Sequence, residues 1–328
     1  RAVVGLRVDV EQDNVRVAGD GPLDVAEQHR VLHLRTEELD GGDGIDTLTG
    51  AVINAVVLTG SGTAGYSGTE SDLGGFEDID VITGTGAVGS TLTGRNTNST
   101  WTLGTVLSYD DQQGNGSVAF SGFANLQGGT GIDTFNVSES VTTNLLGGDG
   151  VDVVNFIGDG QIDGNVDGGL NGVTLDMSLQ TLDQFTDTEL TGLGSLIGFA
   201  GQQDGTTQIT GTYDNVTTFI GGNDPDDDFL TGLDGVSATW TLGAVQTYVS
   251  GGRTLVFSGW EDVFGGTGND TFEVNVATNN MTVNGRGGSD TLQGTQINAV
   301  SLTGSNANGY SGTEDSLDPD ETSFTGIN

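Results

Sequence analysis

The sequence contains no cysteine and no lysine, only 3 prolines, and few aromatic residues, which make up 6% of its 328 residues. Without cysteine, no disulfide can cross-link the fold, and no thiolate can act as a nucleophile or a metal ligand. The 8 arginines face 46 acidic residues, which gives a net charge of −38. Phosphate binding requires clustered positive charge, so we expect no nucleic acid as a partner.

The same lack of positive charge argues against an anionic membrane surface, and no apolar run is long enough to cross a bilayer. We therefore expect no direct membrane insertion. Absent cysteine combined with abundant Asp, Asn, Gly, Thr and Ser is typical of large exported bacterial surface proteins. The sequence therefore predicts a secreted protein of the cell surface or extracellular matrix. It begins at Arg1 and not at Met, so we expect a mature or excised segment.

Internal repeats dominate what is present. The segment from Thr100 to Val137 recurs from Thr239 to Val274, with Trp101 matching Trp240. A second segment, residues 41–70, recurs as residues 285–314. Glycine accounts for 58 residues without a G-X-Y period, which excludes collagen. Repetition of this kind predicts a stacked architecture.

The glycine-rich turns divide the chain into four parts. We expect residues 1–40 to be lead-in coils, that is, coils that complete a repeat preceding the first full one. The first repeat is expected to span residues 41–146, the second residues 147–284, and a partial third residues 285–328. The second repeat carries an insertion around residues 158–205, for which we expect a lateral loop or extra coils.

Apolar residues alternate within short runs, as in Trp101 and Leu103, and the runs are punctuated by GG, DG and NG turns. Copies of the turn recur from residue 128 to 147 and from residue 265 to 285, a spacing that suits one coil of a stack. We therefore expect an all-β, right-handed parallel β-solenoid (β-helix) in the form of an elongated rod. Tandem β-sandwich repeats are the alternative. A helix within residues 24–38 is disfavoured against a strand.

The two ends of the sequence are complementary. Asn328 aligns with Gly84, so the sequence after it would need the length from Thr85 to Gln127 before the next GG turn, and residues 1–40 supply nearly that length. We therefore expect the rod to continue at both ends, either by adjacent repeats or by copies of the chain stacked end to end. A segment boundary that merely fell between repeats is the alternative.

Four turns, GGDGIDT, GGTGIDT, GGDGVDV and GGTGNDT, resemble the calcium-binding nonapeptide GGxGxDxUx of RTX proteins. That resemblance implies calcium held by turn carbonyls and aspartates of neighbouring coils. Spacing of one coil pairs Asp133 with Asp152 and Asp270 with Asp290, which are the candidate metal ligands. The alternative is that the aspartates only accept hydrogen bonds from backbone amides of the turn.

Each of the other candidate sites also has a purely structural explanation. The acidic run at residues 223–229 could hold a cation or form a solvated loop, and the tryptophans could stack on sugars or pack in the core. His29 and His33 would suit a metal only on a helix. No nucleophile motif or phosphate-binding loop occurs, so we expect no enzyme; a polysaccharide-degrading β-helix is a remote alternative.

The WxxG segment, the FSGFxNLxGGTGxDTF segment and the following GGxGxD turn resemble the tandem repeats of giant bacterial surface adhesins of the filamentous-haemagglutinin type. The resemblance covers residue 41 to the end. It implies a secreted stalk or filament that supports adhesion, aggregation or matrix building. A module that binds cations or glycans, with surface glycans or matrix as partners, is the alternative function.

Overall fold

The computed structural model describes residues 39–180, 186–205, 208–222, 228–277, 281–317 and 323–328. Within these residues the chain has strands and no helix, which confirms the predicted all-β class. Nor does this part hold a helix that could cross a membrane. The chain divides into two compact units, Arg1–Thr134 and Phe135–Asn328. The segment 24–38, with His29 and His33, lies outside the described residues.

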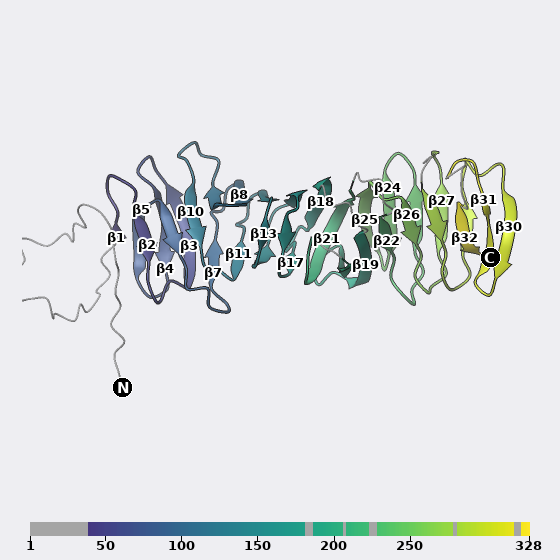
Figure 1. Ribbon diagram of the computed structural model, residues 1–328, viewed down its shortest axis with the longest axis horizontal. Helices are drawn as coiled ribbons and strands as arrows, with labels where there is room; N and C mark the ends of the chain where they lie inside the picture. The colour runs from purple at the N-terminus through teal and green to yellow at the C-terminus, as the bar shows by residue number, and fades with distance from the viewer. Residues whose placement is uncertain (1–38, 181–185, 206–207, 223–227, 278–280, 318–322) are drawn as a thin grey trace, which may run out of the picture. The chain divides into compact units, whose positions relative to one another are not determined.

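Short strands separated by glycine-rich turns make up the first unit (Figure 1). They are β1 (Leu39–Asp40), β2 (Thr47–Thr49), β3 (Ala55–Ser61), β4 (Tyr66–Glu70), β5 (Gly74–Ile79), β6 (Val81–Thr83), β7 (Thr91–Thr93), β8 (Ser99–Leu103), β9 (Leu107–Asp110), β10 (Val118–Ser121) and β11 (Asn125–Gln127), while β12 (Asp133–Val137) runs across the division between the units.

The second unit contains strands of the same kind, several of them longer. They are β13 (Ser140–Val141), β14 (Asn144–Leu146), β15 (Asp152–Gly158), β16 (Gln161–Ile162), β17 (Val166–Asp167), β18 (Val173–Gln180), β19 (Thr186–Leu193), β20 (Phe199–Gly205), β21 (Thr212–Ile220), β22 (Phe229–Thr231), β23 (Thr239–Leu242), β24 (Gln246–Ser250), β25 (Arg253–Ser258), β26 (Asp262–Phe264), β27 (Thr271–Val274), β28 (Thr282–Asn284), β29 (Thr291–Gln293), β30 (Ser301–Asn306), β31 (Gly309–Thr313) and β32 (Phe324–Ile327).

Parallel pairing places equivalent residues directly beside one another. In the first unit β6 lies between β2 and β10, so that Leu48, Ile82 and Phe120 form one inward-facing row. In the second unit β22, β26, β28 and β32 pair in succession and form a longer buried row. This row consists of Leu230, Val263, Val283 and Phe324. Alternation of apolar and polar residues along each strand therefore sends one row into the core and the next to the surface.

The separation in sequence between parallel register partners is short in some strand pairs, and longer and variable in others. A short separation pairs Asp262 with Thr282, and it equals the separation between the turn residues Gly265 and Gly285. A longer separation pairs Thr239 with Thr271, and a still longer one pairs Val166 with Tyr213, so that more of the chain lies between the paired residues. The coil length predicted from the turn spacing is thus found beside Gly265 and Gly285, but as a uniform length it is wrong.

Antiparallel strands account for the longer separations. In the described part of the chain, five three-stranded meanders interrupt the parallel pairing, so the sheet is mixed and not purely parallel as expected. They are β3–β4–β5, β8–β9–β10, β19–β20–β21, β23–β24–β25 and β30–β31–β32. In four of the five, the middle strand delivers a buried aromatic side chain to the core: Tyr66, Tyr109, Phe199 and Tyr248. The meander therefore adds core volume that a short coil lacks.

The repeated tryptophans lie in the same surroundings, one in each unit. Trp101 has its ring centroid 4.7 Å from that of Tyr109 and 5.6 Å from that of Phe120. Trp240 lies 4.5 Å from Tyr248 and 5.6 Å from Phe257. All three tryptophans of the chain are buried, which confirms that they pack in the core.

The segment expected to be an insertion, residues 158–205, contains both kinds of element. β16, β17 and β18 pair in parallel with β13, β14 and β15, and β19 and β20 form an antiparallel hairpin. The predicted boundaries of the four sequence parts stay a prediction.

Candidate functional site

The aspartate of each glycine-rich turn is buried. Asp133, Asp152, Asp270 and Asp290 are each at most 1% exposed. A carboxylate at such depth requires hydrogen-bond donors, because burial without them would be costly. The contacts of these four side chains show what they do in the fold.

Asp133 lies in the first unit at the start of β12. Its Oδ2 accepts the backbone N–H of Gly129 at 2.8 Å, and its Oδ1 accepts the hydroxyl of Ser99. Burial raises the pKa of Asp133 although both bonds act in the opposite direction. Asp152 lies in the second unit, where its backbone N–H donates to Gly172. The pairing of Asp133 with Asp152 stays a prediction, because the two residues belong to separate units.

Asp270 and Asp290 are brought together, as the spacing of one coil predicted. The backbone N–H of Asp270 donates to Oδ1 of Asp290 at 2.9 Å. Oδ1 of Asp270 accepts the N–H of Ala238 at 2.9 Å, and its Oδ2 accepts the N–H of Gly266 at 3.0 Å. Each aspartate therefore closes its own layer onto the preceding one through backbone amides.

Burial and the nearby Asp290 carboxylate raise the pKa of Asp270 to about 6, against the opposing effect of the two backbone bonds. Burial also raises the pKa of Asp290. Its Oδ2 is buried without a hydrogen-bond partner in the structure.

Three of the four carboxylate oxygens of this pair accept backbone amides, whereas calcium requires six to eight oxygen ligands. Among the residues that the structure describes, no group of three or more His, Cys, Asp or Glu side chains could hold a metal ion. The geometry thus favours amide capping, and calcium binding at these turns stays a prediction. Thermal melting with calcium and with a chelator tests it.

The column of turn residues extends to Asn328. Its Oδ1 accepts the N–H of Asp290 at 3.2 Å, and its own N–H donates to the Asp290 carbonyl at 3.0 Å. In the first unit Asp80 makes the same two bonds to Asp46. The expected alignment of Asn328 with Gly84 is therefore wrong, and Asn328 is the counterpart of Asp80. The cause is the stretch between Glu314 and β32, which is longer than that between Glu70 and β5.

Two buried glutamates were missed in the sequence. Oε1 of Glu70 accepts the N–H groups of Asn54 and Ala55, and its Oε2 accepts those of Asp72 and Leu73. Its repeat counterpart Glu314 accepts the N–H groups of Asn298 and Ser316 in the same manner. Each carboxylate thus links the residues next to the start of the first meander strand to the turn that follows the second strand of the same meander. Their signal was the recurring SGTE, which ends at Glu70 and again at Glu314.

These bonds set the charge state of Glu70. Burial pushes its pKa upward, but the backbone bonds from Asp72, Asn54 and Ala55 outweigh burial, so the pKa lies below its ordinary value. A lowered pKa in the fold means that ionised Glu70 stabilises the fold at neutral pH. This contribution is lost as the pH falls through the lowered pKa.

Replacing Glu70 with glutamine is expected to lower the free energy of unfolding by about 2 kcal/mol at neutral pH, because an amide nitrogen would then face backbone donors. The difference from the unchanged chain should shrink in acid, where Glu70 is itself protonated. Thermal melts between pH 7 and pH 3 measure this, with the exposed neighbour Asp72→Asn as control. A difference that does not change with pH would contradict the assignment.

The acidic run at residues 223–229 is described only at its end. Asp228 is buried and accepts the N–H of Gly222 at 3.2 Å, so the expected solvated loop is wrong for this residue. Residues 223–227 lie outside the described residues. No family model, no curated protein and no solved structure matches the chain.

Proposed function

We propose that the chain is a segment of right-handed β-solenoid, in which antiparallel meanders interrupt the parallel coils, from a secreted bacterial surface stalk or extracellular filament. It would belong with the filamentous-haemagglutinin-like adhesins and support adhesion, aggregation or matrix building. The observation that carries the proposal is the stacking of equivalent turns through their aspartates, as between Asp270 and Asp290. Such stacking is a device for building length, because each layer is held mainly by its neighbours.

The composition of the contacts supports a mechanical role. Both carboxylate oxygens of Asp133 and of Asp270, and Oδ1 of Asp290, accept hydrogen bonds from their own turn or from an adjacent layer, so the fold occupies these oxygens. Parallel rows of buried aliphatic and aromatic residues hold the layers from inside. The strong negative charge suits an exported surface, since it keeps copies soluble and apart laterally.

An exposed apolar face on β30 and β31 supports end-to-end continuation. Leu302 is 60% exposed and Tyr310 is 52% exposed, whereas their repeat counterparts Leu58 and Tyr66 are 2% and 1% exposed. In the first unit Tyr66 is covered by β9 and the turn after it, with its hydroxyl donating to Gly116 at 2.9 Å. We propose that an equivalent layer, from an adjacent repeat or another copy, covers Leu302 and Tyr310.

The purified chain is expected to associate end to end as its concentration rises, and the double change Leu302→Asp with Tyr310→Ser should weaken this association about tenfold, since it places charge in an apolar contact. Analytical ultracentrifugation and negative-stain electron microscopy measure it. Leu170→Asp, at another exposed leucine, is the control. Discrete single particles of the unchanged chain at all concentrations would contradict stacking of copies.

A further inference from the structure

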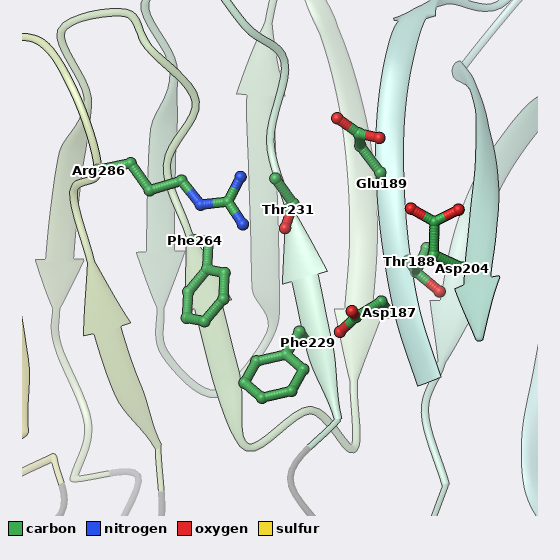
Figure 2. Close-up of a pocket in the computed structure, with 8 residues that line it drawn as sticks. All are labelled: Asp187, Thr188, Glu189, Asp204, Phe229, Thr231, Phe264 and Arg286. Atoms are coloured by element: carbon green, nitrogen blue, oxygen red, sulfur yellow. The ribbon is translucent and has the colours of Figure 1, made fainter. Parts of the chain in front are cut away.

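A cavity of about 470 Å³ lies on the outer face of the second unit, where the β19–β20 hairpin meets β22 and β26. None of the turn aspartates takes part in it. It is lined by Asp187, Thr188, Glu189, Asp204, Phe229, Thr231, Phe264 and Arg286, as Figure 2 shows. These eight side chains form the acidic groove.

One wall of the acidic groove carries three carboxylates. Asp187 pairs directly with Asp204 across the antiparallel strands β19 and β20, so the two acids lie side by side. Glu189 is two residues further along β19 and therefore faces the same side. Burial and the charge of Asp204 raise the pKa of Asp187, while Arg286 opposes them. Three acids against one arginine leave the lining with an excess of negative charge.

The adjoining wall, formed by β22 and β26 next to β19, carries two phenyl rings on the same outer side of the sheet. Phe229 and Phe264 have centroids 5.0 Å apart, and their inward neighbours Leu230 and Val263 are the ones that fill the core. The guanidinium carbon of Arg286 lies 4.9 Å from the centroid of Phe264. This is the geometry of a cation–π contact. The groove therefore already accommodates a guanidinium from its own chain.

We propose that the acidic groove binds an organic cation, a guanidinium or alkylammonium group on a short apolar chain. The charged end would lie among Asp187, Glu189 and Asp204, and the apolar part would lie against Phe229 and Phe264. Arg286 occupies part of this space and competes with the ligand. The binding function is separate from the proposed role as a stalk, and neither depends on the other.

The chemistry of the walls favours this class over a sugar or a metal ion. A neutral sugar would use the rings but would gain nothing from the excess negative charge, whereas a guanidinium or ammonium group uses both walls. A bare metal ion would use the carboxylates but not the rings. Arg286 shows which ligand type fits, because its own guanidinium is seated over Phe264 within reach of the acidic wall.

Isothermal titration with agmatine, which bears a guanidinium on a butyl chain, tests the proposal on the full chain. Asp187→Asn and Asp204→Asn are each expected to weaken agmatine binding about tenfold, in line with loss of a charge-assisted contact. Arg286→Ala is expected to strengthen it, because the competing cation is removed. Asp149→Asn, an exposed acid of the same unit outside the groove, is the matched control and should change nothing.

A capped peptide, acetyl-Gly-Arg-Gly-amide, separates the two sources of such a cation. Agmatine binding more tightly than the peptide assigns the groove to a small free cation, and the reverse assigns it to an arginine of a protein partner; both support the proposal. Three results overturn it: no binding of either probe, weaker binding in Arg286→Ala, or an effect of Asp149→Asn as large as that of Asp187→Asn. The last would mean attraction to the net charge alone. Circular dichroism of each variant confirms that the fold is intact.

Discussion

Replacing Trp240 with alanine is expected to lower the stability of the second unit by about 4 kcal/mol. The side chain is fully buried, and its ring lies within 4.5 to 6.0 Å of the rings of Tyr248, Phe257 and Phe272. Those three rings come from two strands of one meander and from the parallel neighbour β27, so the indole joins both kinds of pairing. Removing it would leave a cavity that the surrounding strands cannot close without breaking their ladders.

Chemical denaturation followed by circular dichroism measures this loss. Val245→Ala is the matched control, since Val245 lies in the turn between β23 and β24 and is 61% exposed. That change should alter stability by less than about 0.5 kcal/mol. Hydrogen exchange should place the loss near β23–β27, because in a stacked repeat each layer is stabilised by its immediate neighbours. Equal stability of the two variants would contradict the described core.

Replacing Gly268 with alanine is expected to cost about 3 kcal/mol, because the added methyl group would overlap the main chain of the neighbouring layer. A Cβ at this position would collide with the carbonyl oxygen of Val236. No rotamer change relieves such an overlap, since the obstacle is backbone. The turn and the segment at Val236 would have to separate. The hydrogen bond from the backbone N–H of Ala238 to Oδ1 of Asp270 lies beside them.

The next turn along the chain supplies the control. Gly287 belongs to the degraded copy of the motif, and a Cβ there would have no neighbour closer than 3.7 Å. Gly287→Ala should therefore leave the melting temperature nearly unchanged, whereas Gly268→Ala should lower it by several degrees. Both are measured by thermal melting at neutral pH. If Gly268→Ala melted together with Gly287→Ala, the turns would not be in contact with the layer before them.

The sequence predicts those parts of the fold whose interactions produce a periodic pattern of apolar and polar residues. Alternation identified the strands and the buried tryptophans, because inward positions must be apolar whichever way the neighbouring strand runs. For the same reason, alternation could not separate parallel from antiparallel neighbours, and the meanders were missed. One local signal was present. Ser250 pairs with Arg253 across Gly251 and Gly252, both with positive φ, which is the two-residue glycine turn of a hairpin.

The candidate site was predictable in part. The spacing of the turns located Asp270 next to Asp290, since equal turn lengths bring equal positions into contact. These aspartates accept hydrogen bonds from backbone N–H groups. Every residue except proline has such a group, so the sequence does not show which residues donate. Glu70 was overlooked because all but one of its described partners are main-chain groups. The acidic groove was hidden because Asp187, Phe229 and Phe264 become neighbours only through strand pairing.

The contacts between layers all require equivalent residues of successive layers to lie side by side in parallel register. Because the chain has no cysteine, an engineered disulfide tests this directly. Glu273 and Gln293 are register partners on β27 and β29, and their side chains meet at 3.0 Å.

The pair Glu273→Cys with Gln293→Cys should therefore form a disulfide rapidly under mild oxidation, since register partners fall within the span that a disulfide bridges. The offset pair Glu273→Cys with Thr291→Cys should oxidise far more slowly. Mass spectrometry of the digested protein measures both yields. Rapid closure of the first pair alone is the predicted result, and equal yields, or no closure of the first pair, would contradict the stacked parallel register.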